Sequence, residues 1–160
     1  MSQIKMTGKM LYLRYSFPCA KGRCDRKEIT PDDLEELTRL VKNGEEPIES
    51  FLNHCFPLSF GPFTLCSEKK YPGNKWSVES VRYFWRNEHG RNGDERVNLC
   101  HTEKAIVVRE FLCDLKEGGI LVSLAFPGSH NSFPGINFYG LDLKKGDEVE
   151  LHQKWVVEKS

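Results

Sequence analysis

Hydrophobic and polar residues alternate most regularly near the end of the chain, after the turn signal Gly146-Asp147. An alternation with a period of two is typical of a strand that has one buried face. One face would carry Val149, Leu151, Trp155 and Val157, and the other would carry Glu150, His152, Lys154 and Glu158. The pattern therefore predicts one antiparallel strand over residues 148–158, with His152 pointing outward among charged side chains.

Three further apolar segments in the second half of the chain also read as strands, at residues 105–112, 120–126 and 136–141. Glycine and proline pairs separate them, at positions 118–119, 127–128 and 134–135. Short strands at this spacing, with turn residues between them, are typical of a small barrel or sandwich.

The first half of the chain begins with another alternating segment, at residues 10–17. It predicts a strand that Pro18 ends, because proline has no amide hydrogen to donate to a sheet. A compact loop that contains Cys19 and Cys24 would follow.

Three helices are predicted next. The first begins after Thr30, which is a good N-cap before Pro31, and ends at Gly44. The second runs from Pro47 to residue 54 or 55, and residues 56–65 are interpreted as an ordered loop. Ser77 caps the third helix and Gly90 stops it. The buried face of this third helix would contain Val78, Val81, Phe84 and Trp85.

The sequence pattern changes from helical to strand-like after residues 91–96, which are polar and contain Gly93. We therefore expect a helical N-terminal region over residues 1–96 and a small β-barrel domain over residues 97–160. The predicted fold class is α+β, with an N-terminal strand and three helices packed on a small antiparallel β-barrel that is OB-like.

Composition limits the function. The 160 residues are 39% hydrophobic, which is enough for a core, and 23 basic residues balance 23 acidic ones. A nucleic-acid partner is not expected, because such proteins usually carry a basic excess. No membrane partner is expected either, and without a signal-peptide pattern we expect a cytoplasmic protein whose six cysteines are reduced.

Cys100 and His152 are the first candidate metal ligands. A thiolate and an imidazole suit iron, zinc or copper. Cys100 precedes the first barrel strand and His152 lies on the last, and in a small closed sheet the first and last strands often lie side by side. The alternative is that Cys100 is a small buried apolar residue and His152 a solvated one.

Cys19 and Cys24 are the second candidate pair. A zinc site would need two more ligands, and Cys55 with Cys66 is the available pair. A loop pair used for redox chemistry is the alternative. No nucleophile elbow, zinc-protease helix or phosphate loop occurs in the sequence, so we expect a protein that is not an enzyme.

The closing segment resembles a known family. Gly146-Asp147, Val149, Leu151-His152 and Trp155 to Lys159 are similar to the last strand of the HypC/HupF hydrogenase-maturation chaperones. Cys100, followed by the aliphatic run at residues 105–108, is similar to the start of their barrel. In that family the cysteine and the histidine hold an iron fragment bound for nickel–iron hydrogenase. The resemblance implies the same roles for Cys100 and His152.

The first half is similar to a group of hydrogenase-associated prokaryotic proteins. The similarity rests on Arg14-Tyr15-Ser16-Phe17-Pro18, which leads to Cys24, and on Tyr83-Phe84-Trp85. Together the resemblances imply a non-enzymatic accessory protein that binds iron, as a metal-centre precursor, or a protein partner. That partner would be a maturation factor or a metalloenzyme subunit.

The alternative function is a ligand- or RNA-binding barrel. It requires exposed aromatic side chains as a stacking platform beside a basic groove. The aromatic candidates are Phe133, Phe138 and Tyr139, and the basic candidates are Arg109, Lys116 and Lys144.

Overall fold

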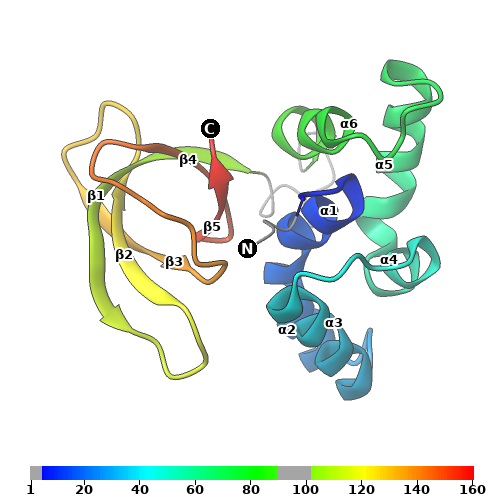
Figure 1. Ribbon diagram of the computed structural model, residues 1–160, viewed down its shortest axis with the longest axis horizontal. Helices are drawn as coiled ribbons and strands as arrows, with labels where there is room; N and C mark the ends of the chain where they lie inside the picture. Colours follow the sequence, from blue (N-terminus) through cyan, green and yellow to red (C-terminus); the bar gives the residue numbers. More distant parts are fainter. Residues whose placement is uncertain (1–4, 90–101) are drawn as a thin grey trace. The chain divides into compact units, whose positions relative to one another are not determined.

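A computed structural model describes residues 5–89 and 102–160, and these fall into two compact units. The first unit is helical and the second is a β-barrel (Figure 1). The helices are α1 (Gly8–Ser16), η1 (Phe17–Cys19), α2 (Ala20–Asp25), α3 (Pro31–Asn43), α4 (Glu49–Cys55), α5 (Pro57–Lys70), α6 (Val78–Tyr83) and the π-helical turn η2 (Phe84–Glu88). The strands are β1 (Glu103–Asp114), β2 (Ile120–Ala125), β3 (Ser132–Asn137), β4 (Glu148–His152) and β5 (Trp155–Lys159). The α+β class predicted from the sequence is confirmed. Within the described residues, no helix combines the length and the hydropathy that a bilayer crossing requires.

The predicted N-terminal strand is wrong, because residues 8–16 form α1. Thr7 caps this helix, and its hydroxyl oxygen accepts a hydrogen bond from the Met10 amide at 3.2 Å. Most of the helix is buried, including Met10, Leu11, Tyr12, Leu13 and Tyr15. A segment that is apolar on every side matches a strand pattern and a helix pattern equally well. The loop predicted around Cys19 and Cys24 is also wrong, because η1 and α2 occupy it.

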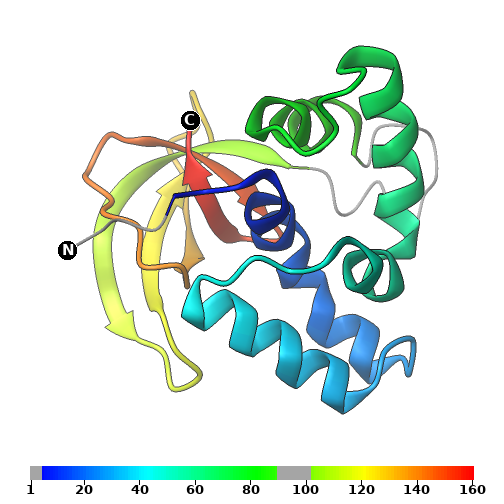
Figure 2. The same cartoon turned by 45° about the vertical axis from the view of Figure 1, so that its right-hand side comes forward.

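The helix predicted after Thr30 is confirmed as α3. The Thr30 hydroxyl oxygen accepts from the Asp33 amide at 3.1 Å, and the Asp33 carboxylate accepts from the Thr30 amide at 3.1 Å. This reciprocal capping box satisfies two amides that a helix start leaves unpaired. Gly44 ends the helix with φ at 61°, a left-handed conformation that glycine adopts at little cost. Figure 2 shows α2 and α3 side by side.

The second predicted helix is confirmed as α4, but the loop predicted at residues 56–65 is wrong. These residues belong to α5, which begins at Pro57 and also contains Pro62. Proline fits the first turn of a helix but disfavours its interior. Phe60, Phe63 and Ser67 are buried at helical spacing. The free energy gained by burying them outweighs the cost of placing Pro62 inside the helix.

The third predicted helix is confirmed as α6 with the π-helical turn η2. Ser77 caps it, because its side-chain oxygen accepts from the Ser80 amide at 3.1 Å. In η2 the His89 amide donates to the Phe84 carbonyl oxygen at 2.8 Å. The predicted stop at Gly90 and the predicted boundary at residues 91–96 lie outside the described residues.

Aromatic rings form the centre of the helical unit. Tyr12 contacts Phe63 and Trp85, with ring centroids 5.1 Å and 5.4 Å away, and Tyr15 stacks on Trp85 at 5.6 Å. The Tyr12 hydroxyl lies 2.6 Å from the Ser59 hydroxyl oxygen, so this buried polar group is satisfied. Burial raises the pKa of Tyr12 above its ordinary value, and the side chain stays neutral.

The strands close into a barrel in the order β1-β2-β3-β5-β4, with β4 returning to β1. The prediction of a barrel is confirmed, but an all-antiparallel sheet is wrong, because β3 and β5 run parallel. The third strand also lies earlier than predicted, since β3 includes Pro134 and Gly135, which the sequence pattern treats as separators. A Cβ atom at Gly135 would overlap the Leu124 side chain, so any larger residue would require Leu124 to move.

The single strand predicted at residues 148–158 is wrong. The chain turns at Gln153-Lys154, and both residues have positive φ, at 52° and 68°. Leu151 therefore pairs with Val156, and His152 pairs with Trp155. The turn shifts the alternation of buried and exposed residues by one position. Val149 and Leu151 therefore share the barrel core with Val156. The sequence pattern had placed Trp155 and Val157 on that face instead.

The barrel core consists of small and branched aliphatic residues from several strands. Its buried members are Ala105, Val107, Val122, Leu124, Leu143, Val149, Leu151 and Val156. Figures 1 and 2 show the β1–β2 hairpin extending beyond the rest of the barrel. Register shifts in β1 bend this strand, and Phe111 and Leu112 beside them are 56% and 38% exposed.

Replacing Gly8 with alanine is expected to destabilise the helical unit. A Cβ atom at Gly8 would overlap the Trp76 carbonyl group, which is backbone and yields little. We expect a loss of about 2 kcal/mol in the free energy of unfolding, measured by urea denaturation. Gly61→Ala is the matched control, because this glycine is also helical and has open space around it. The control should gain about 0.5–1 kcal/mol from helix propensity. Equal stability of the two variants would contradict the packing.

Candidate functional site

The start of β1, the end of β2, the start of β3 and the end of β4 adjoin one another in turn at one end of the barrel, which we call the first rim. Here β1 begins at Glu103, which pairs with Leu151 near the end of β4. The start of β3 lies opposite the end of β2, and His152 at the end of β4 pairs with Trp155 at the start of β5. Neighbouring strands of the barrel begin or end beside each other here, so the first rim brings together segments that are far apart in the sequence.

His152 occupies this rim but does not point into solvent. Its side chain is 0% exposed, so the predicted outward position among charges is wrong. Glu150 and Glu158, which the sequence pattern also places outside, are 2% and 7% exposed and pair directly across β4 and β5. The Ser160 hydroxyl donates to Glu150 Oε1 at 3.2 Å. Both faces of the β4–β5 hairpin are therefore buried, which a period of two does not reveal.

Cys100, the partner predicted for His152, lies outside the described residues. The first described residue of the barrel unit is Thr102, which is buried. Because Glu103 pairs with Leu151, the chain joins β1 beside the end of β4 that carries His152. The first strand, β1, pairs with β4, which is the first part of the segment predicted as the last strand, and the last strand β5 pairs with β3 and β4 instead.

The helical unit contains four of the described cysteines. Cys19 is the last residue of η1, and Cys24 lies on α2. Cys55 is buried, which raises its pKa to about 12, and burial also raises the pKa of Cys66. Across residues 5–89 and 102–160 no group of three or more His, Cys, Asp or Glu side chains is placed to hold a metal ion. Cys19, Cys24, Cys55 and Cys66 all lie within these ranges.

A cluster of two phenylalanines and a lysine lies at the first rim. Lys154 Nζ is 4.0 Å from the centroid of the Phe133 ring and 5.3 Å from that of Phe126. The two rings lie 4.6 Å apart, and Phe133 packs against the barrel core. We call these three residues the rim cluster. It combines an apolar surface with a cation, which is the chemistry of a binding site for an anionic group.

The aromatic platform predicted for a nucleic acid is divided. Phe133 belongs to the rim cluster, whereas Phe138 and Tyr139 pack with Trp155 at 4.9 Å and 6.1 Å between centroids. All of these rings are half-buried. The basic candidates Arg109, Lys116 and Lys144 are exposed, and Lys144 Nζ pairs with Asp142 at 3.2 Å.

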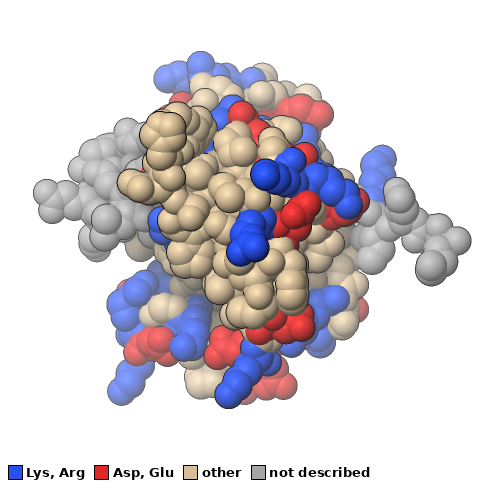
Figure 3. Space-filling model, turned by 90° about the vertical axis from the view of Figure 1, so that its left-hand side faces the viewer, with Lys and Arg blue, Asp and Glu red and all other residues tan. Residues whose placement is uncertain are grey.

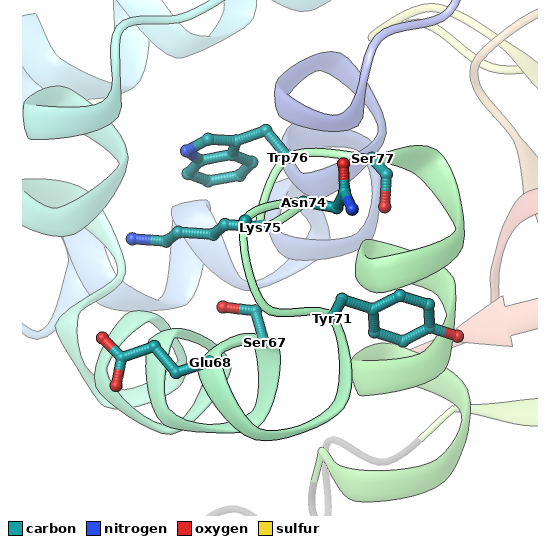
Figure 4. A pocket seen from close by; sticks show the side chains of 8 residues that line it. Ser67, Glu68, Tyr71, Asn74, Lys75, Trp76 and Ser77 are labelled. Carbon is teal, nitrogen blue, oxygen red and sulfur yellow. The ribbon is translucent and has the colours of Figure 1, made fainter.

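The helical unit contains a cavity of about 510 Å³ between the end of α5 and the start of α6 (Figure 4). In Figure 4 the side chains of Lys75 and Trp76 point to the same side of the connecting loop. Lys75 Nζ donates to Glu49 Oε1 at 2.6 Å and lies 4.6 Å from the Phe60 ring centroid. The Ser67 hydroxyl donates to the Thr64 carbonyl oxygen at 2.9 Å. Since these polar groups are engaged in the fold, the cavity is a weaker candidate than the first rim.

Comparisons with protein-family models, curated proteins and solved structures give no significant match.

Sequence reasoning did not find the rim cluster. Phe126, Phe133 and Lys154 come from three separate segments, and no local pattern links them. One signal was present, because Phe126-Pro127-Gly128 and Phe133-Pro134-Gly135 repeat a phenylalanine followed by turn residues. It places two aromatic rings at adjoining strand ends only when β2 and β3 are known to pair.

Replacing Lys75 with methionine tests the contacts beside the cavity. The hydrogen bond from Lys75 holds the pKa of Glu49 below its ordinary value. Because the pKa of Glu49 is lowered in the folded protein, its contact stabilises the fold at pH values above the unfolded-state pKa of about 4.3. This stability is lost as the pH falls through the folded-state pKa of Glu49. We expect the variant to be about 1 kcal/mol less stable at pH 7, mainly from the lost cation–π contact. The deficit should narrow at pH 3.

The measurement is urea unfolding at both pH values, with Lys21→Met as the control, because Lys21 is an exposed helical lysine. A deficit that stays constant between pH 7 and pH 3 would show that the Glu49 contact adds nothing.

Proposed function

We propose that the chain is a non-enzymatic accessory protein whose barrel receives a metal-centre precursor, or the protein that carries one, at the first rim. The pairing of Glu103 with Leu151 is the observation that carries the proposal. It brings the start of β1, which follows Cys100 in the sequence, to the end of β4, where His152 lies. A thiolate and an imidazole from these positions are suitable ligands for iron.

The strand order supports an OB-like barrel. A closed five-stranded barrel with the order β1-β2-β3-β5-β4 and one parallel pair is an arrangement in which consecutive strands are not all neighbours. OB-like barrels are five-stranded Greek-key barrels that serve as binding modules. An OB-like barrel therefore favours a binding function over catalysis, although a fold by itself does not define function.

The lysines near the first rim differ in how they support a thiolate. Lys104 Nζ pairs with Glu148 at 3.3 Å, so its charge is partly compensated. Lys154 Nζ lies over the rings of the rim cluster and pairs with no described carboxylate. A nearby cation stabilises a cysteine thiolate. Lys104, four residues after Cys100 in the sequence, is the lysine that we assign to the ionised form of Cys100, because Lys154 is engaged with the rim cluster.

Burial of His152 is consistent with a ligand role. A fully buried imidazole has a fixed orientation, and metal ligands are held in place by their surroundings in this way. In the proposed site Cys100 is the group that binds the iron of the precursor, and His152 is the second ligand or a hydrogen-bond donor to it. The partner would then be a maturation factor or a metalloenzyme subunit, as the resemblance to hydrogenase-maturation chaperones implies.

Replacing Cys100 with serine is expected to abolish iron capture without unfolding the barrel. The protein is expressed together with iron and purified without oxygen, and bound iron is measured by elemental analysis. Cys113→Ser is the matched control, because Cys113 is an exposed cysteine near the far end of β1 and should leave iron capture unchanged. Full iron content in the Cys100→Ser protein would remove Cys100 from the mechanism.

His152→Gln separates ligation from packing. Because His152 is buried, this variant can lose stability, so thermal unfolding is recorded beside the iron content. The proposal expects a folded variant with at least a tenfold loss of iron affinity, by analogy with lost metal ligands and their supports. A folded variant that binds iron as tightly as the original protein would exclude His152 as a ligand.

A further inference from the structure

The ammonium group of Lys154 is held in one place at the first rim. It lies over the face of Phe133 at 4.0 Å and near Phe126 at 5.3 Å. Phe133 is anchored because it packs against the barrel core. Contact with two aromatic faces restricts a side chain that would otherwise lose much rotamer entropy when it binds a ligand. The cation is therefore preorganised for binding.

The backbone beneath this side chain is strained. Gln153 and Lys154 both adopt left-handed φ values, of 52° and 68°. Turns of this kind usually contain asparagine and glycine, for which the conformation costs little. The Lys154 carbonyl oxygen accepts from the Ile136 amide at 2.8 Å, which fixes the turn to β3. A lysine at a position where glycine would relieve strain indicates that its side chain has a role of its own.

Among the described residues, the barrel lysines Lys104, Lys144 and Lys159 pair with carboxylates, whereas Lys154, like Lys116 and Lys145, makes no ion pair. Lys104 pairs with Glu148 at 3.3 Å, and Lys159 pairs with Asp147 at 3.1 Å. Among the described residues, Lys154 makes cation–π contacts and no ion pair. Its positive charge is thus available to an external anion.

The β2–β3 loop supplies further polar groups at the same rim. Phe126 is the first residue of this loop, and Phe133 lies just after its end on β3, so the two rings of the rim cluster flank it. A turn forms at its start, where the Ser129 amide donates to the Phe126 carbonyl oxygen at 3.0 Å. The side chains of His130 and Asn131 are exposed, and both are able to donate hydrogen bonds.

We infer that Lys154 and the β2–β3 loop form a binding site for a carboxylate on a protein partner. The ammonium pairs with the carboxylate, the loop donates hydrogen bonds to it, and Phe126 with the exposed Pro127 contacts an apolar side chain next to it. This inference rests on the proposed function, which it deepens by naming the chemistry of the partner. Aromatic residues are enriched in the cores of protein interfaces, and a charge beside them fixes the orientation of the partner.

The charge of the chain favours a protein over a nucleic acid. Basic and acidic residues are equal in number. On the face shown in Figure 3, Lys and Arg groups alternate with Asp and Glu groups around a broad uncharged area. A nucleic-acid site would need several phosphate contacts along a basic stripe. A single preorganised ammonium matches a single carboxylate instead.

The test uses the full chain, metal-free and ¹⁵N-labelled, at low salt. The probe is an acetylated Leu-Glu-Glu-Leu peptide, with a Leu-Gln-Gln-Leu peptide and oligothymidylate for comparison. We expect amide shifts confined to the β2–β3 loop and the Gln153-Lys154 turn. Lys154→Met should weaken binding of the acidic peptide about tenfold, which corresponds to one charge-assisted contact, and Lys154→Arg should restore it. Lys116→Met, at an exposed lysine on the β1–β2 hairpin, should bind like the original protein.

Three results would overturn the inference: equal affinity of the Lys154→Met protein, equal affinity for the neutral peptide, or binding of oligothymidylate alone. The Lys154→Gly variant tests whether a loss of binding comes from misfolding, because glycine adopts the left-handed turn without strain. This variant should keep the thermal stability of the original protein within a few degrees and still lose the peptide. Because no metal is present, Cys100→Ser should bind the peptide normally, so failure of iron capture and failure of this site are distinguishable.

Discussion

The barrel is closed by one short contact between β3 and β5. The Ile136 amide donates to the Lys154 carbonyl oxygen, and Ile136 pairs with Trp155 in parallel orientation. Gly135 favours this approach, because a Cβ atom there would lie 3.2 Å from the Lys154 carbonyl oxygen. Without this contact β3 and β5 would be open edges, which invite pairing with other chains. Closure also ties the Gln153-Lys154 turn to β3.

The same closure produces the first rim. It places the start of β1 beside the end of β4, and it sets Lys154 over the rings that flank the β2–β3 loop. The metal-ligand proposal and the carboxylate-site proposal thus concern neighbouring parts of one rim. They differ in chemistry, since the first needs a thiolate and an imidazole and the second needs a cation and an apolar surface.

Local signals in the sequence were sufficient for some elements and not for others. The helix α3 was predictable because Thr30, Asp33 and Gly44 act within a few residues of one another. The segments that form α1 and α5 were not, because α1 is buried on almost every side and α5 contains an internal proline. In both, tertiary burial decides a conformation that local preference leaves open or disfavours.

The candidate site shows the same division. The sequence suggested His152 as a ligand, but it placed His152 in solvent, because a period of two does not show that both faces of the β4–β5 hairpin are buried. It also did not show that Gln153 and Lys154 form a turn. Glutamine and lysine are unusual in such a turn, so the residue types did not predict it.

The sequence by itself determined the fold class, the barrel half and the capped helices, because periodicity and capping act over a few residues. Only the tertiary structure decided the strand order, the burial of both faces of the β4–β5 hairpin and the meeting of Lys154 with Phe126 and Phe133. These features arise from pairings between segments far apart in the chain, and a one-residue change at a turn reverses which side chains face the core.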